Sequence, residues 1–217
     1  AGARPARPGN ASTPHARNVK HITKLIVMSQ TYRQTAGPRA DLADIDPNNR
    51  LLAAQSPRRL EAEFVRDNAL AIAGALNPEI GGPGVRPYQP PGYYVNLQFP
   101  DRDYDADTDD RQYRRGVYMW WQRTFLQPML ANFDAPSREE CTVNRVNSNT
   151  PLQALVLLND PIYVEASRVF AENILKHGGQ TLDSQINWAF ERAVSRIPTL
   201  PERRALTELY GKSLLQF

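Results

Sequence analysis

The sequence has very few of the residues that build disulfide, metal or haem sites. Cys141 is the only cysteine among 217 residues, so no internal disulfide can form, and neither the CxxC pattern of zinc sites nor the CxxCH pattern of c-type haem attachment is present. The three histidines, His15, His21 and His177, share no metal-ligand spacing. We expect no cofactor in this chain, and we interpret Cys141 as a small buried thiol, since a thiolate nucleophile needs a nearby base.

Long apolar runs are also missing. No stretch approaches the roughly 18 to 20 residues that a membrane-spanning helix needs, so no transmembrane segment is expected. Residues 1–18 are rich in Pro, Gly and Arg and lack the apolar segment of a signal peptide. We interpret them as a linker or a ragged terminus.

Positive charge exceeds negative charge only slightly. Lys and Arg number 26 against 23 Asp and Glu, which gives a net charge of +3 and a pI near 9.1. A nucleic-acid-binding domain should show a basic stripe interleaved with aromatic residues, or a known reading motif, and the sequence has neither. We therefore expect no nucleic-acid partner.

What the sequence does contain is helical periodicity. Hydrophobic residues make up 41% of the chain, enough for one sizeable core, and they recur at helical spacing in several segments. A first helix is predicted over residues 19–34 with Asn18 as N-cap, and a second over residues 57–76 with Ser56 as N-cap. Shorter helices are expected at residues 128–133 and 138–141.

Residues 150–217 are predicted to form a C-terminal helical subdomain. Thr150 begins a capping-box pattern with proline at the first helical position, and Asp160 with the proline after it caps the next helix, which runs to about residue 176. Thr199 begins a further capping box. Residues 181–196 and 199–217 are therefore expected to form a helical hairpin.

The middle of the chain has a different character. Residues 77–115 hold clustered Pro, Gly and Tyr and then an acidic stretch, and they predict an extended arm followed by an acidic loop. Residues 116–123 favour a short β element, with a helix as the alternative. The predicted fold is mainly α: an irregular helical bundle with a long proline- and aromatic-rich loop, forming one domain over residues 19–217.

Several blocks resemble, in order, the uncharacterised domain found C-terminal to planctomycete-type cytochrome c domains. The blocks are residues 20–34, 46–52, 58–63, 81–92, 114–118, 124–139, 150–155 and 158–161. The resemblance implies a large extracytoplasmic bacterial protein, periplasmic or secreted, with haem c on an associated domain. It also implies that upstream domains are partners of this chain.

One segment contains the side-chain types that a hydrolytic or ligand-binding site needs. Asp134, Arg138 and Glu139 place two carboxylates and a guanidinium within six positions, and they are the candidate catalytic residues. The alternative is structural, because Ser137 followed three residues later by Glu140 is also a capping box that starts a helix.

The candidate ligand-binding residues lie outside that segment. Arg86, Tyr88 and Tyr93 of the arm can contact a sugar or a peptide, or they can pack on the helices. Asn149 precedes a helix N-terminus, whose dipole suits an anion, although a hydrogen-bonded loop is the alternative. Arg33 is included as a guanidinium that would line a pocket with residues 134–139.

The acidic loop raises the question of calcium. Asp101, Asp103 and Asp105 alternate with other residues as oxygen ligands do in calcium loops. The glycine that lets such loops turn is absent, and Gln112 stands where a bidentate Glu is needed. A solvated acidic loop is therefore favoured over a metal site.

These observations predict an accessory binding or structural module, related to polysaccharide, within a cytochrome-c-linked protein. The alternative is a hydrolytic enzyme domain acting on carbohydrates or their esters, with Asp134, Arg138 and Glu139 beside Asn149 as its polar centre. A cleft that gathers these groups would favour the enzyme, and a filled, salt-bridged cluster would favour the binding module.

Overall fold

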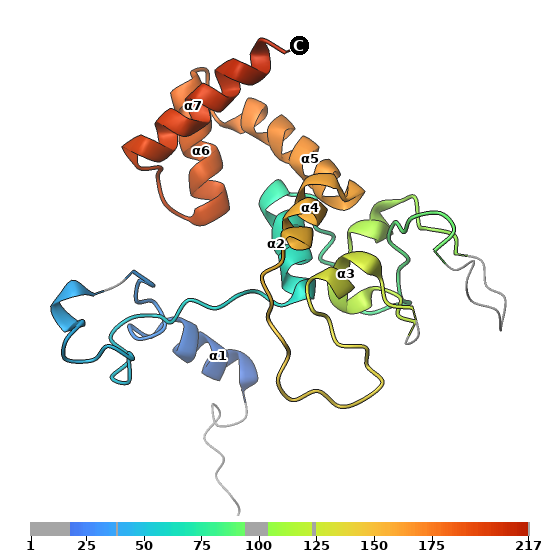
Figure 1. The fold of residues 1–217 in the computed structure, drawn as a ribbon, viewed down its shortest axis with the longest axis horizontal. Helices are drawn as coiled ribbons and strands as arrows, with labels where there is room; N and C mark the ends of the chain where they lie inside the picture. Colours follow the sequence, from blue (N-terminus) through green and yellow to red (C-terminus); the bar gives the residue numbers. More distant parts are fainter. Residues whose placement is uncertain (1–17, 38, 94–103, 123–124, 217) are drawn as a thin grey trace, which may run out of the picture. The chain divides into compact units, whose positions relative to one another are not determined.

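The computed structural model of the chain describes residues 18–37, 39–93, 104–122 and 125–216 (Figure 1). The described residues are mainly helical, as predicted. The chain divides into two compact units, Ala1–Arg59 and Leu60–Phe217. Among the described residues, no helix is long and apolar enough to cross a membrane.

In the first unit, α1 is shorter than the periodicity predicts. It spans Val19–Val27, and the side chain of Asn18 caps it by accepting from the backbone N–H of His21, as expected. The prediction that this helix continues to residue 34 is wrong. The Ser29 hydroxyl donates to the Ile26 carbonyl at 2.7 Å, and serine competes in this way for the carbonyls that a longer helix would use.

The remainder of the first unit is a hydrogen-bonded loop that contains the short 3-10 helix η1, Ala40–Leu42. The Asp46 carboxylate accepts from the backbone N–H groups of Arg50 and Leu51 at 2.8 and 2.7 Å. The Asn49 side chain bonds both backbone groups of Ala54, and Asn49 itself has a φ of 51°. This is the turn chemistry that aspartate and asparagine favour.

The second unit has its core around α2, Ala62–Ala73, which packs against α3, Pro128–Asn132, and α5, Pro161–His177. Leu70 of α2 and Leu130 of α3 are fully buried. The helix predicted over residues 57–76 begins only at Ala62, and Glu61 replaces Ser56 at the N-cap position. The Ser56 hydroxyl instead accepts from the Asn49 side chain at 3.4 Å, so it is engaged in the loop.

The C-terminal helices agree closely with the predicted boundaries. They are α4, Pro151–Asn159, followed by α5, then α6, Leu182–Val194, and α7, Leu200–Leu214. The side chain of Thr150 caps α4 and that of Asp160 caps α5. A reciprocal capping box between Thr199 and Glu202 begins α7. These starts are local features, because one side chain binds backbone groups two or three residues away.

The predicted short β element at residues 116–123 is wrong for the described part of that segment. The chain forms the 3-10 helices η2, Asp110–Tyr113, and η3, Gly116–Tyr118. Among the described residues, the arm and this region form two isolated β-bridges, from Asn77 to Arg114 and from Val85 to Met119. The Gly116 N–H donates to the Asp67 carboxylate at 2.7 Å. This hydrogen bond holds η3 against α2, whereas a strand would use its backbone N–H groups to pair with a neighbouring strand.

Two buried arginines hold the arm and the 3-10 segment in place. Arg66 of α2 donates to the carbonyls of Gln112 and Arg114. Arg114 donates to the carbonyls of Pro83 and Gly81, and its guanidinium lies 4.1 Å from the centre of the Tyr118 ring. Irregular backbone inside a core needs such partners, because a buried carbonyl without one is costly.

Candidate functional site

Asp134 lies at the end of α3 with a φ of 62°. Its carboxylate accepts from the backbone N–H of Ser148 at 2.7 Å and from the Ser148 hydroxyl at 2.8 Å. The same hydroxyl accepts from the Gln153 amide at 3.2 Å. Asp134 therefore fastens the base of the loop formed by residues 135–149 to the first turn of α4.

Arg138 and Glu139 lie on that loop and are exposed. The helix predicted at residues 138–141 does not form, since Arg138 has a φ of 61°. The Arg138 guanidinium lies over the Trp121 ring at 4.1 Å from its centre and 3.9 Å from a Glu63 oxygen. The backbone N–H of Glu139 reaches the Ser137 hydroxyl at 3.4 Å.

Arg145 lies in the same loop and was not among the candidate site residues. Its guanidinium contacts Glu63 at 2.7 Å and Glu61 at 3.0 Å, and the hydrogen bond that it donates to Glu63 raises the pKa of Arg145. Glu61 is the N-cap residue of α2, and Glu63 lies in its first turn. Together with Arg138 they form a salt-bridged cluster, which holds the loop to α2 at a second point.

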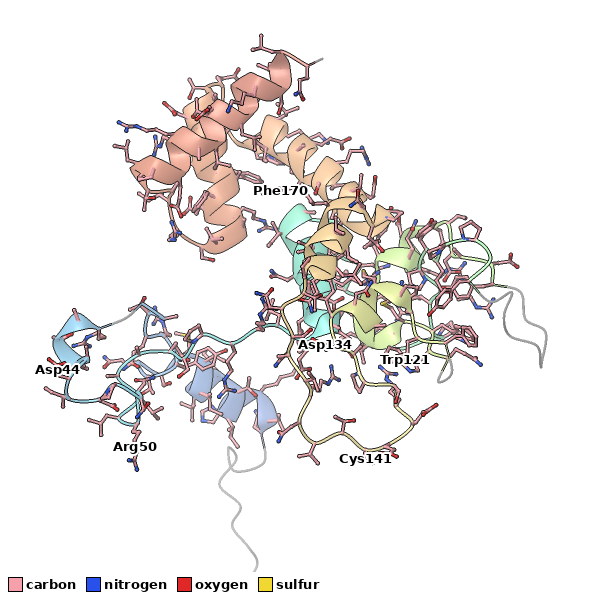
Figure 2. All side chains as sticks on the ribbon, viewed as in Figure 1. Asp44, Arg50, Trp121, Asp134, Cys141 and Phe170 are labelled. Atoms are coloured by element: carbon pink, nitrogen blue, oxygen red, sulfur yellow. The ribbon has the colours of Figure 1, made fainter. Side chains whose placement is uncertain are left out.

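The other two candidates of the loop, Asn149 and Cys141, are exposed. Asn149 is exposed and lies between Ser148 and the start of α4. Cys141 is also exposed, on the far bend of the loop (Figure 2). The interpretation of Cys141 as a buried thiol is wrong, because Cys141 lies within residues 137–144, all of which are exposed.

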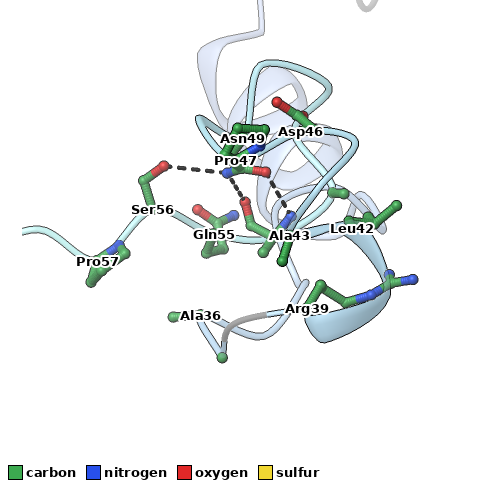
Figure 3. Close-up of a pocket in the computed structure, with 13 residues that line it drawn as sticks. Ala36, Arg39, Leu42, Ala43, Asp46, Pro47, Asn49, Gln55, Ser56 and Pro57 are labelled. Carbon is green, nitrogen blue, oxygen red and sulfur yellow. Dashed lines mark hydrogen bonds between the residues drawn. The ribbon is translucent and has the colours of Figure 1, made fainter.

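Arg33 belongs to the first unit and is exposed there. That unit has a hollow of about 510 Å³ lined mainly by small side chains, among them Ala36, Ala43 and Pro57. The Asn49 amide faces Ala54 and Ser56 in this hollow (Figure 3). Its hydrogen-bonding groups are thus directed at the loop itself, and Arg33 is not among the lining residues.

In the arm, Arg86 and Tyr93 are used for packing. The Arg86 guanidinium lies 5.5 Å from the centre of the Trp120 ring, and its backbone N–H donates to Asp107 at 2.8 Å. The Tyr93 hydroxyl donates to the Leu126 carbonyl at 2.6 Å. Tyr93 also meets the ring of Phe125 edge to face.

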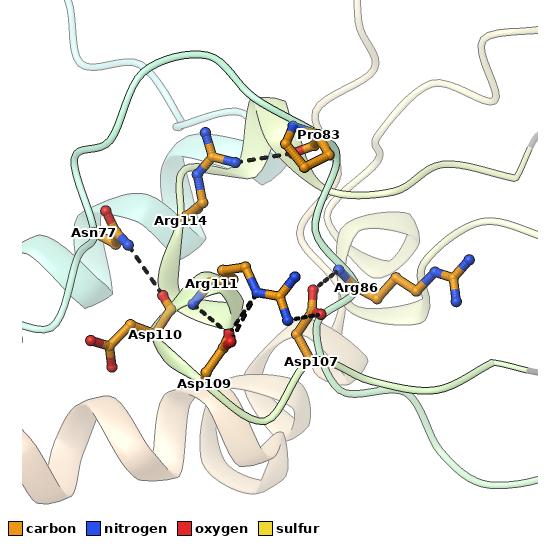
Figure 4. A network of polar contacts seen from close by, with 8 residues as sticks. All are labelled: Asn77, Pro83, Arg86, Asp107, Asp109, Asp110, Arg111 and Arg114. Atoms are coloured by element: carbon orange, nitrogen blue, oxygen red, sulfur yellow. Dashed lines mark hydrogen bonds and ion pairs between the residues drawn. The ribbon is translucent and has the colours of Figure 1, made fainter.

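The acidic loop is partly accounted for by ion pairs. Asp101 and Asp103, two of the calcium candidates, lie outside the described residues, and Asp105 is exposed. Arg111 pairs with Asp107 at 3.2 Å and with Asp109 at 2.9 Å (Figure 4). Within the described residues, no group of three or more His, Cys, Asp or Glu side chains could hold a metal ion.

Tyr88 differs from the other arm residues because it lines a hollow of about 380 Å³, called here the Tyr88 hollow. The hollow is lined by Tyr88, Pro90, Gln127, Pro128, Met129, Asn132, Leu155, Val156, Asn159, Asp160 and Pro161. Its wall is apolar, with three amides and one carboxylate. It joins the arm to α3 and to the junction of α4 and α5, about seventy residues further along the chain.

The polar groups of the Tyr88 hollow are partly engaged by the backbone. Gln127 donates to the Tyr88 carbonyl at 3.3 Å and accepts from the Leu130 N–H at 3.0 Å. The Asn159 amide donates to the Leu155 carbonyl at 2.8 Å. Asp160 accepts from the Ile162 N–H at 3.0 Å, and burial raises the pKa of this carboxyl.

The fold is that of a mainly helical domain whose polar residues hold loops in place. Residues 13–210 match the model of the PSD1 family, a protein family of unknown function (DUF1553). The chain belongs to this family, because the match covers most of its length. No curated protein and no solved structure matches the chain.

Proposed function

We propose that this chain is an accessory binding module that holds a sugar unit of a polysaccharide in the Tyr88 hollow. The observation that carries the proposal is the meeting of the arm with the α4–α5 junction in one hollow of about 380 Å³. This size lies within the usual range for small-ligand sites, which combine apolar walls with a few polar groups.

The lining suits a neutral polyol. Tyr88 is 40% exposed, and its ring offers a flat apolar face to the C–H groups of a sugar ring. Asn132 and Asn159 present amides at the same surface, and amides can donate to and accept from hydroxyl groups. Proline side chains complete the wall, and they lose little conformational entropy on binding.

The same lining favours binding over hydrolysis. Glycoside hydrolysis commonly uses two carboxylates that flank the scissile bond, and Asp160 is the one carboxylate among the described lining residues. Its oxygen is engaged as the N-cap of α5. Asp134, Arg138 and Glu139 do not line this hollow, and the carboxylate of Asp134 is bonded to Ser148.

Following the resemblance noted from the sequence, we propose that this module belongs to a large extracytoplasmic protein of planctomycete type. Haem c would then reside on an associated domain, and the upstream domains would be the partners of this chain. In that setting a polysaccharide-binding module would hold the protein at its ligand, while any redox chemistry would belong to the neighbouring domain.

The test is a glycan array followed by calorimetry on the best ligand. Tyr88→Ala is expected to weaken binding about fivefold to tenfold, because it removes one aromatic contact. Tyr210→Ala is the matched control, since Tyr210 lies on α7 and is similarly exposed. An array on which the unmodified chain binds no glycan would remove polysaccharide as the ligand, and equal losses in both variants would exclude the Tyr88 hollow.

A further inference from the structure

The first unit differs from a folded core in one respect: none of its described residues is buried. The apolar side chains of α1 are largely in contact with solvent, with 76% of Val19 and 59% of Leu25 exposed. A contiguous exposed apolar surface commonly marks a binding site, whereas single exposed apolar residues do not.

The exposed side chains of α1 lie on one face. Val19, Ile22 and Ile26 recur at intervals of three and four residues, which superimposes them along one side of a helix. Lys20 and Lys24 fall four residues apart and lie on the opposite side. The helix therefore combines an apolar stripe with a cationic face.

The charge of the first unit is far from balanced. Residues 1–59 contain ten Lys and Arg against three Asp and no Glu, whereas residues 60–217 contain 16 Lys and Arg against 20 Asp and Glu. The net charge of +3 is therefore the sum of a net charge of +7 in the first unit and −4 in the second. Of the three aspartates, Asp41 is paired with Arg39, and Asp46 accepts from two backbone N–H groups.

We propose that α1 binds an anionic lipid surface, with its apolar stripe in the interface and Lys20 and Lys24 directed to the headgroups. A basic amphipathic helix that lies in the membrane plane has this composition. The nine residues of α1 span about 13 Å, which fits shallow insertion. An anionic polymer would satisfy the lysines but leave the apolar stripe in water, and a second copy would bring two units of like charge together.

The experiment measures how much of the full chain sediments with vesicles of two compositions. One is pure phosphatidylcholine, and in the other part of the phosphatidylcholine is replaced by the anionic lipid phosphatidylglycerol. Anionic vesicles are expected to bind at least about tenfold more tightly, since each Lys or Arg near such a surface contributes about 1 kcal/mol. The double variant Leu25→Glu, Ile26→Glu should lose this binding. Leu51→Glu, a change of the same kind at an exposed loop position, should keep it.

The double variant Lys20→Gln, Lys24→Gln leaves the apolar stripe intact. It tests the proposal even if α1 does not form in the glutamate variant. It should weaken binding to anionic vesicles and remove most of its salt dependence, with unchanged circular dichroism. Equal binding to both kinds of vesicle would overturn the proposal. An unaltered affinity of the glutamate variant would also overturn it, because it would indicate a purely ionic contact. So would sedimentation of the unmodified chain as a dimer without vesicles, if the glutamate variant sedimented as a monomer.

Discussion

The helices α1 and α2 show how little amphipathicity alone says about burial. The sequence predicts an apolar face for each, and α1 has the more regular stripe. Yet α1 has no buried residue, whereas α2 buries Ala62, Leu70 and even the charged Arg66. The helix with the clearer apolar pattern is thus the one left in solvent.

This difference between α1 and α2 shows that the elements packed around a helix decide whether its apolar face is buried. α2 contacts α3, α5 and η3, and these neighbours supply both apolar contacts and carbonyl groups for a guanidinium. A buried charge is tolerated only when it is paired and hydrogen-bonded. In the first unit no comparable set of elements packs on α1 among the described residues, so its stripe remains available to a partner.

The largest effect is expected from Arg66→Met. The change leaves the carbonyls of Gln112 and Arg114 without their donor and Asp67 without its ion pair, which should lower the free energy of unfolding by about 3 to 5 kcal/mol. Urea unfolding measures it. Arg204→Met, at an exposed position of α7, is the control and should stay within about 0.5 kcal/mol. Similar losses in the two variants would mean that Arg66 does not hold the core.

A pair of leucine variants tests the comparison of the two helices directly. Leu70→Ala should lower the free energy of unfolding by about 2 to 5 kcal/mol, because it leaves a cavity in a packed core. Leu25→Ala should change it by no more than about 0.5 kcal/mol, since Leu25 is exposed. A large loss in Leu25→Ala would show that α1 is packed within the chain, and it would also remove the basis of the lipid proposal.

The smallest effect concerns pH. Burial raises the pKa of Asp160 above its ordinary 3.8, so the folded state keeps this proton after the unfolded state has released it. The free energy of unfolding therefore falls as the pH rises from 3.8 through the raised value in the folded state. Asp160→Asn should remove this decline while preserving the N-cap of α5, because asparagine caps as well as aspartate.

Urea unfolding at a series of pH values measures that decline, and Asp44→Asn, at an exposed position of the first unit, is the matched control. A decline that persists unchanged in Asp160→Asn would assign it to another carboxyl. Asp67 is the next group to examine, because burial also raises its pKa.

Much of the fold could be predicted where one side chain acts on nearby backbone. Asn18, Thr150 and Asp160 cap the helices expected of them. The start of α2 was missed because Ser56 is engaged by Asn49, a contact across seven residues. The β element was wrongly predicted, because the Gly116 N–H donates to Asp67, a contact across 49 residues.

The candidate site was less predictable for the same reason. Asp134 was chosen for its chemistry, but its role follows from Ser148, whose N–H and hydroxyl it binds. Arg145 carried only a faint signal, a guanidinium within an asparagine-rich run, and its partner Glu63 lies 82 residues away on α2. Tyr88 was one of several aromatic candidates, and nothing in its own neighbourhood distinguished it from Tyr93.

The sequence by itself determined a mainly helical chain and most helix starts, since a cap acts over a few residues and its free energy is local. It also determined the uneven charge of the two units. Only the tertiary structure decided that Arg66 is buried while Leu25 is exposed, and that Tyr88 and Asn159 line one hollow. These outcomes depend on contacts between distant segments, where packing and paired hydrogen bonds outweigh the preference of any single residue.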